Sequence, residues 1–445
     1  MTRKDPTPNE PITAELLDEL CRFPLLDAIF DRRTRRFGLG MEIPDGPLAY
    51  RSKENPIPLS DLERMILVLC GCGVSGWNTG MEHTASGEPD TGCNYPLRLT
   101  GRTSASAAGC LASEMIFMDD SGAWLTRFRD LEPEKWREFS AARDLEKMAA
   151  QMRAHCVKLA DGRVMVPQKP PHTSPHNVWN ANRPGSTLFA PIVDLTQQAL
   201  NFLAIYLSMG YVLYDAPNGR ICGNFERFVK AGLVDDKRRF PLADFEQYVL
   251  ATAAMEIALM CNNIVLALQA MGLGGWMYTG INPPSLMGAF SARGIGGLGF
   301  RFVNRPGWIL PNPVGIDGYF EALCPPYFSD MRAAVDHFVD LKFGPGGAYD
   351  SYRRGPWRNS WKVRINVERY PGAMVEMLAE AADYIYRAYG KFPATIPSIY
   401  MRAYAQAQHI DLDFYDKFFG PDSYLASHAQ HMRKWHGADS SRRDK

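Results

Sequence analysis

One apolar stretch constrains the fold more than any other feature of the chain. Residues 251–276 are almost continuously apolar, and the helical pattern covers 247–272. A stretch of this length could cross a membrane, but it carries polar side chains that the centre of a bilayer would penalise, namely Glu256, Asn262, Asn263 and Gln269. We therefore expect a helix buried on nearly every side, either inside one large domain or between two copies of the chain.

Charge and composition exclude several classes of protein. The chain of 445 residues has 49 basic and 49 acidic side chains, and 46% of its residues are hydrophobic. Because the charges cancel, nothing in the composition favours nucleic acid or an anionic membrane as a partner. The polar N-terminus lacks the apolar segment of a signal peptide. We expect a cytoplasmic protein with a well-filled core.

The nine cysteines do not have the pattern of a disulfide framework. Their number is odd and they are scattered along the chain, so reduced thiols are expected. Cys70 and Cys72 could be combined with Cys93 and His83 into a zinc site, but the paired C-x-x-C spacing is missing. We treat the cysteines as small buried residues and expect no metal site.

Local patterns predict an α+β fold. Residues 12–33 have the pattern of a first helix. Ser60-Asp61-Leu62-Glu63 is a capping-box pattern in front of an apolar helix. Residues 113–118 and 123–128 are typical of two strands joined by the turn Asp-Asp-Ser-Gly.

Three separated segments carry residue types suited to a ligand. In the first, the guanidinium groups and hydroxyl of Arg32, Arg33, Thr34 and Arg36 match a phosphate, although such a run can also be a solvated surface. The second, 102–109, is rich in small residues that let backbone N–H groups approach a flat ring, or that simply form a tight turn. The third, 272–281, follows the apolar helix and could be only a helix stop.

In this order the three segments resemble the nitroreductase superfamily of FMN-dependent oxidoreductases. The family's RRS-x-R-like signature matches Arg32, Arg33, Thr34 and Arg36, with Thr in place of Ser. The GVT and R-x-x-PSAG pattern of the branch that oxidises azoline rings resembles 73–76 and 102–109, with Ala105 in place of proline. Another register matches Ser75 and Asn78 to the PSxxN loop of ordinary nitroreductases. We prefer the first register because a strand pair follows it directly.

The resemblance also implies which residues hold the cofactor. A pair whose backbone approaches the flavin N5 edge in the family falls on Thr279 and Gly280, and many members have Glu at the position of Thr279. Arg35 is not part of the motif and is expected to matter less for FMN binding than its neighbours. The implied FMN-binding residues are Arg32, Arg33, Thr34, Arg36, Ser104, Ser106, Ala107, Gly109, Thr279 and Gly280.

The same resemblance implies the architecture. It predicts helices around a mixed sheet, in a homodimer that binds FMN at the subunit interface with residues from both chains. The expected division of the chain is an N-terminal arm and helix over 1–23, an FMN-binding core over 24–319 with an insertion at about 127–246, and a mainly helical extension over 320–445. Within the insertion, the proline-rich segment 167–191 is expected to cover the site, with candidate contacts at His172, His176, Asn177, Trp179, Asn180 and Arg183.

The activity that the resemblance implies is ping-pong hydride transfer. Hydride from NAD(P)H would reach flavin N5 and then pass to a small conjugated or aromatic acceptor such as a nitro compound, a quinone or an enone. The lack of a separate Rossmann G-x-G-x-x-G motif suits this scheme. One alternative is a dehydrogenase acting on a peptide or natural-product ring, although the Lys-Tyr base of that branch has no convincing counterpart. Another is a non-catalytic flavin-binding or partner subunit.

Overall fold

A seven-stranded sheet forms the centre of the molecule. The computed structural model describes residues 14–81, 94–107, 109–142 and 144–437. The strand order is β12-β17-β8-β5-β6-β7, and β16 also pairs with β8. The strands are β5 (Ser113–Asp119), β6 (Gly122–Thr126), β7 (Cys156–Ala160), β8 (Thr187–Asp194), β12 (Gly274–Tyr278), β16 (Ile399–Tyr400) and β17 (Tyr404–Gln408).

The α+β class is the predicted one, but the large sheet differs from the mixed sheet that was expected. Every strand pair in it is antiparallel. A parallel pair, β9 with β11, occurs in a separate small sheet. All eight residues of β8 are buried, because this central strand is covered on both faces.

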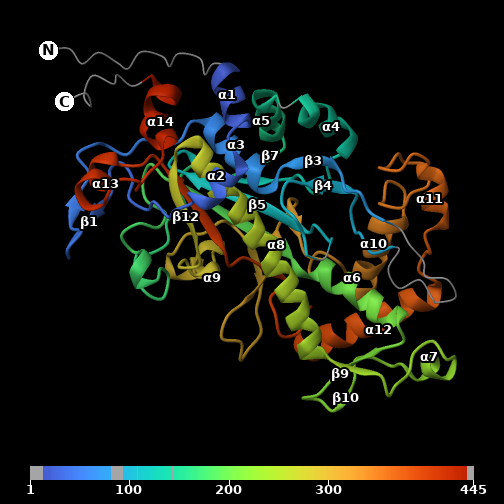
Figure 1. Cartoon of the computed structure of the whole chain (residues 1–445). Coiled ribbons are helices and arrows are strands. Elements are labelled where there is room, and N and C mark those ends of the chain that lie inside the picture. The colour runs from blue at the N-terminus through green and yellow to red at the C-terminus, as the bar shows by residue number, and fades with distance from the viewer. Residues whose placement is uncertain (1–13, 82–93, 108, 143, 438–445) are drawn as a thin grey trace.

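Helix α8 (Leu242–Met271) crosses the middle of the molecule and packs against this sheet (Figure 1). It confirms the helix predicted over 247–272. The helix ends at Gly272, where φ is +76° and where a Cβ atom would lie 2.2 Å from the carbonyl oxygen of Ser427, so that only glycine fits. The carboxylate of Glu256 accepts a hydrogen bond from the Ser113 hydroxyl inside the core.

The burial of α8 within one chain is incomplete. In the described part of the chain it is the one helix long and apolar enough to cross a membrane by length and composition, and half of its most apolar stretch is buried. It contacts α3 and α6 as well as the sheet. Met255 nevertheless remains 53% exposed and Leu259 37% exposed. The expectation of burial on nearly every side is therefore not met by a single copy.

The capping box and the strand pair are both confirmed. Helix α3 (Asp61–Cys72) begins where the Glu63 N–H donates to Ser60 Oγ at 3.2 Å and the Ser60 N–H donates to Glu63 Oε2 at 2.6 Å. Strands β5 and β6 pair from Ile116–Leu125 to Asp119–Gly122. The helix expected over 12–33 is instead two helices, because Pro24 cannot continue the first one.

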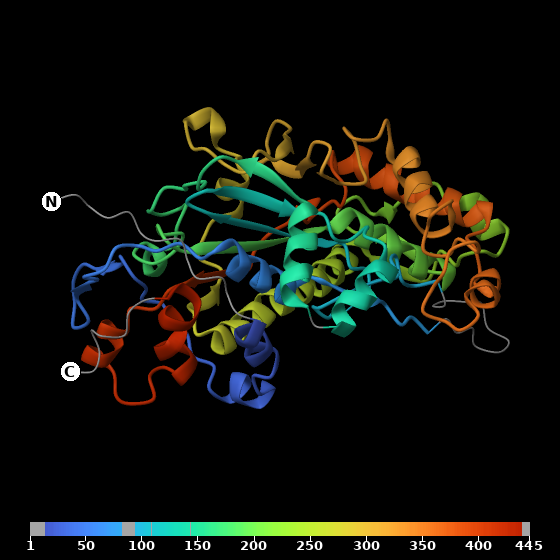
Figure 2. The same ribbon diagram turned by 90° about the horizontal axis from the view of Figure 1, so that it is seen from above.

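The remaining helices surround the sheet and α8 (Figures 1 and 2). At the two ends of the chain, α1 and α14 are joined by an ion pair between Lys434 and Glu19. The helices are α1 (Ala14–Cys21), α2 (Leu25–Phe30), α4 (Pro133–Ala142), α5 (Leu145–Ala154), α6 (Leu195–Ser208), α7 (Glu226–Lys230), α9 (Pro283–Met287), α10 (Met331–Phe343), α11 (Ser360–Asn366), α12 (Gly372–Tyr389), α13 (Leu412–Phe418) and α14 (Ala426–His436).

Four small sheets complete the fold. Their strands are β1 (Glu42–Ile43) with β2 (Tyr50–Arg51), β3 (Val74–Trp77) with β4 (Thr100–Arg102), β9 (Val212–Asp215) with β10 (Arg220–Ile221) and β11 (Arg239–Pro241), and β13 (Arg301–Val303) with β14 (Asn312–Ile316) and β15 (Phe320–Glu321).

The predicted insertion and the predicted extension both contribute strands to the large sheet. Strand β8, at the centre, comes from the predicted insertion, and its neighbour β17 comes from the predicted extension. One continuous apolar core includes side chains from Leu16 to Trp435. The segments are therefore interleaved in a shared core.

The described cysteines are free thiols. Burial raises the pKa of Cys70 to about 11 and that of Cys72 to about 12. Thiols with raised pKa values are poor nucleophiles, which fits their interpretation as packing residues. Cys93 and His83 lie outside the described residues.

Candidate functional site

The arginine-rich segment runs along the edge of the large sheet. Arg35 forms a β-bridge with Gly275, whose N–H donates to the Arg35 carbonyl at 2.8 Å. Side chains alternate along an extended segment, so Arg35 points inward while Thr34 and Arg36 point outward. The four predicted phosphate ligands in this segment are all exposed: Arg32, Arg33, Thr34 and Arg36.

Arg35 is part of the core. Its side chain is 2% exposed, its Nε donates to the Ser423 carbonyl at 2.8 Å, and its Nη1 donates to Gln269 Oε1 at 2.6 Å. Burial lowers its pKa to about 10, so it remains charged at neutral pH. Arg35 therefore has a structural role, and the expectation that it contributes less to FMN binding than its neighbours stays a prediction.

Thr279 and Gly280 follow the other end of the strand that begins beside Arg35. Thr279 lies four positions after Gly275 along the extended chain, a distance of roughly 13 Å. Met277 is 45% exposed, and Thr279, two residues further on, is also exposed. Arg35 and the pair Thr279-Gly280 thus lie at opposite ends of one edge strand.

A turn from the predicted cover lies directly over Gly280. The Ser174 N–H donates to the Gly280 carbonyl at 2.8 Å, and the Asn282 N–H donates to the His172 carbonyl at 2.9 Å. A Cβ atom at Gly280 would lie 2.1 Å from Asn177 Oδ1, so the turn packs closely against Gly280. Residues 172–177 therefore cover one end of the predicted site.

Two other parts of the predicted cover have structural roles. The ring of Trp179 stacks on Phe37, with centroids 6.4 Å apart, and belongs to a small apolar cluster. Residues 187–191 are the first part of β8. Trp179 thus packs on Phe37 while its side chain remains partly exposed.

The small-residue loop 103–109 packs on a different part of the molecule. The Thr103 N–H donates to the Gly73 carbonyl at 2.9 Å, and Asn263 of α8 donates to the Thr103 carbonyl at 3.1 Å. Ser104 is buried and Ala107 is exposed. Ser106 Oγ is buried and has no hydrogen-bond partner among the described residues.

Gly109 of the same loop has φ +64°, and a Cβ atom there would approach the Tyr95 ring at 3.2 Å. Ala108 lies outside the described residues. Between the described parts of this loop and the other two motifs, no hydrogen bond or bridge is formed. Within one chain the structure therefore joins the arginine segment to the segment 272–281. The small-residue loop 103–109 lies apart from both.

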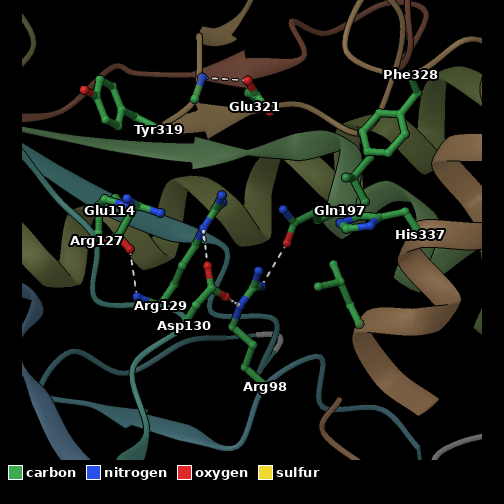
Figure 3. Close-up of a pocket in the computed structure, with 13 residues that line it drawn as sticks. Arg98, Glu114, Arg127, Arg129, Asp130, Gln197, Tyr319, Glu321, Phe328 and His337 are labelled. Carbon is green, nitrogen blue, oxygen red and sulfur yellow. Dashed lines mark hydrogen bonds and ion pairs between the residues drawn. The ribbon is translucent and has the colours of Figure 1, made fainter. Parts of the chain in front are cut away.

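A polar cavity of about 260 Å³ was not predicted from the sequence (Figure 3). Three of the side chains in its wall are arginines and three are carboxylates, namely Arg98, Arg127, Arg129, Glu114, Asp130 and Glu321. A neighbouring cavity of about 240 Å³ shares Arg98, Arg129 and Asp130 with it. The only feature of the sequence that could have indicated this cavity is a charged residue within an apolar stretch, such as Glu114 in 113–118.

Hydrogen bonds fix the polar groups of this cavity. Arg98 donates from Nε to Asp130 Oδ1 at 2.8 Å and from Nη1 to Gln197 Oε1 at 2.8 Å. Glu114 Oε1 accepts the backbone N–H groups of Phe128 and Arg129, each at 2.7 Å. Because the opposite charges are equal in number and Arg98 is engaged, the cavity offers little net attraction to an ionic ligand.

The surroundings shift the pKa values of two carboxylates in the cavity, Glu114 and Asp130, in opposite directions. Burial raises the pKa of Glu114, although Arg102 and Arg129 oppose this effect. Burial also acts to raise the pKa of Asp130, but Arg98 and Arg129 outweigh it and the pKa falls below its ordinary value. The side chain of Asp130 is 65% exposed, because it faces the open cavity.

Comparisons with known proteins do not assign a family. No family model and no curated protein sequence matches the chain. A solved structure from Ralstonia eutropha, described as a "putative nitroreductase", is 13% identical, with a TM-score of 0.25 and coverage of 63% of this chain and 76% of the other. A TM-score this low does not establish a common fold. The α+β class therefore rests on the elements described above.

Proposed function

We propose that this protein is an FMN-dependent oxidoreductase that transfers hydride from NAD(P)H to a small conjugated or aromatic acceptor. The observation that supports this most is the backbone pairing of Arg35 with Gly275. It joins the exposed arginines to the start of β12, and Thr279 and Gly280 follow the end of the same strand. Two of the segments on which the resemblance rests are therefore neighbours in space.

The arginine segment has the donors that a flavin phosphate needs. The guanidinium groups of Arg32 and Arg36 are exposed and form no hydrogen bond with the described residues. Arg33 is partly engaged, because its Nη1 donates to the carbonyls of Phe30 and Arg32 at 3.0 Å each. Arg32, Arg36 and the Thr34 hydroxyl are the groups that would hold the phosphate.

The other end of β12 offers a place for the flavin ring. Met277 and Thr279 are exposed on the outer side of the strand, and the turn 172–177 covers Gly280 beside them. Bound FMN supplies the hydride acceptor and donor at N5, while the protein positions the reactants. The role of this chain would be to orient the ring along β12 and to exclude water with the covering turn.

A second copy of the chain would complete the site. Helix α2 contacts α8, and it exposes Leu25, Leu26 and Phe30 by 65%, 62% and 72%. Met255 and Leu259 of α8 are exposed as well, and an exposed apolar surface of this kind is typical of a subunit interface. In a homodimer joined by this surface, the loop 103–109 of one copy would approach the arginine segment of the other.

The absorption spectrum of the purified protein, with mass identification of any released cofactor, tests the flavin proposal. The expected result is a yellow protein that releases FMN, or a colourless protein that takes up added FMN. Anaerobic addition of NADPH or NADH should then bleach the flavin band. A colourless protein that does not bind FMN would contradict the proposal. A bound flavin that stays oxidised in excess of both nucleotides would leave the non-catalytic flavin-binding alternative.

A further inference from the structure

Three histidines and a glutamate meet inside the protein, and none of them belongs to the segments assigned to flavin. Glu63, His409, His431 and His436 each offer one ligand atom, and these atoms all lie within 4.8 Å of one another. We propose that they bind one divalent transition-metal ion of the zinc type. None of the cysteines considered in the sequence analysis takes part.

The spacing of the four atoms suits a tetrahedral ion. Glu63 Oε1 lies 2.9 Å from His431 Nε2 and 3.1 Å from His436 Nε2. Bonds of about 2.0–2.1 Å from a tetrahedral zinc ion to its ligands would place neighbouring ligand atoms roughly 3.3 Å apart. Both separations are slightly shorter than this value, and no two of the four ligand atoms are more than 4.8 Å apart. Small side-chain movements would therefore bring all four atoms into coordination.

Two of the imidazoles have ring nitrogens without a partner. His431 Nε2 makes no hydrogen bond in spite of its distance of 2.9 Å from Glu63, because it is not directed at that oxygen. His409 Nδ1 is likewise buried without a partner among the described residues. Leaving two buried ring nitrogens unpaired is costly, and a shared cation would satisfy both.

The other polar atoms of the cluster are held as metal ligands usually are. His431 Nδ1 lies 2.6 Å from the Met271 carbonyl, which can only accept, so Nδ1 carries the proton and Nε2 keeps its lone pair for the centre of the cluster. Glu63 Oε2 accepts the Ser60 N–H at 2.6 Å, which leaves Oε1 for the ion. Imidazole and carboxylate are both common zinc ligands.

The site would join three distant parts of the chain. Glu63 lies in the first turn of α3, His409 follows β17, and His431 and His436 belong to α14. The His409 carbonyl also accepts the Leu39 N–H at 3.0 Å, just beyond the arginine segment. The side chains of Glu63 and His431 are at most 1% exposed and that of His436 is 14% exposed, so the ion would enter past His436 and hold α14 on the core.

Zinc binding by the full-length, tag-free protein tests this proposal without reference to flavin. After removal of metal by a chelator and reloading with Zn²⁺, the protein should retain one zinc ion per chain through gel filtration, as measured by mass spectrometry of the metal. His436→Gln and Glu63→Gln should each weaken zinc binding by at least about tenfold, measured by competition with a chromophoric chelator. His176→Gln, which changes an exposed histidine outside the cluster, should bind like the wild type.

Cobalt provides a measurement that needs no variant. Co²⁺ bound to the wild-type protein should give the intense visible bands of tetrahedral coordination, and Zn²⁺ should abolish them. Failure of the folded wild-type protein to retain zinc would overturn the proposal, since the cluster would then be a hydrogen-bonded group without metal. Equal zinc affinity of folded His436→Gln and wild type would also overturn it, because the ion would then lie elsewhere.

Discussion

Arg35 Nη1 donates a hydrogen bond of 2.6 Å to Gln269 Oε1, two residues before the longest helix of the protein ends. The Arg35 carbonyl also accepts the Gly275 N–H, and its Nε donates to the Ser423 carbonyl. One arginine thus fastens the segment 31–36 to α8, to β12 and to the chain before α14. Its neighbours Arg32 and Arg36 are left facing solvent.

Arg35→Ala should reduce the free energy of unfolding by about 2–4 kcal/mol, because it removes two charge-assisted hydrogen bonds and leaves Gln269 Oε1 buried without a donor. Urea unfolding measures this change. Arg32→Ala is the matched control, and its effect on stability should stay within about 0.5 kcal/mol since the side chain is exposed. If both variants unfold at the urea concentration of the wild type, the structural role of Arg35 is refuted.

Arg32→Ala and Arg36→Ala should each weaken FMN binding while leaving the fold intact. Loss of one strong contact to a charged phosphate costs about 1.5–3 kcal/mol, which corresponds to roughly a 10- to 150-fold higher Kd. Fluorescence titration of the apoprotein with FMN measures the affinity. Arg22→Ala, at a surface arginine paired only with Asp18, should leave Kd unchanged. If Arg32→Ala and Arg36→Ala both bind FMN with the affinity of the wild type, the arginines are a solvated surface that does not contact the ligand.

Phe30→Asp should convert a dimer into monomers, because a charge would replace a side chain that is 72% exposed on the apolar surface of α2. Light scattering coupled to gel filtration gives the mass of the wild type and the variant. Tyr352→Asp changes a side chain that is 94% exposed elsewhere and should not alter the mass. A monomeric wild-type protein would exclude a flavin site that is shared between subunits.

The stability of the protein should depend on the ionisation of Asp215. This buried carboxylate accepts hydrogen bonds from Asn218 at 2.8 Å, from Tyr389 at 2.7 Å and from Tyr384 at 2.9 Å. Burial acts to raise the pKa of Asp215, but these hydrogen bonds outweigh it and the pKa is lower than in the unfolded chain. The stabilisation is therefore complete above the unfolded value of about 3.9 and is lost as the pH falls through the lower folded value.

Tyr389→Phe should lower the stability near neutral pH by about 1–2 kcal/mol and should reduce the loss of stability on acidification. Urea unfolding of variant and wild type at neutral and acidic pH measures both effects. Tyr352→Phe is a control at an exposed tyrosine. An acid dependence in Tyr389→Phe identical to that of the wild type would show that this hydrogen bond does not set the pKa of Asp215.

Features that depend on neighbouring residues could be predicted from the sequence. The capping box at Ser60 and Glu63, the turn between β5 and β6, and the glycine stop of α8 each involve only a few consecutive residues. The break at Pro24 belongs to the same class and could have been predicted from the proline. These signals fix where elements begin and end, but they do not fix which elements meet.

Features that depend on distant segments could not be predicted. The pattern of β8 and β17 does not show that they pair at the centre of the sheet, because that pairing is decided by the whole core. Side chains alternate in direction along the extended segment 31–36, so every second one points inward. Only the positions of Gln269 and Ser423 show that Arg35 is one of the inward-pointing residues. The histidine cluster draws on positions 63, 409, 431 and 436, a spacing that matches no common metal motif.

We propose that exposed arginines of this chain hold the phosphate of a bound flavin. Titration of the apoprotein with FMN and, separately, with riboflavin tests this most directly, since the two ligands differ only in the phosphate. We predict saturable binding of one FMN per chain and much weaker binding of riboflavin, with the difference largely lost in Arg32→Ala and Arg36→Ala. Equal affinity for the two ligands, or no saturable binding of FMN, would contradict the account.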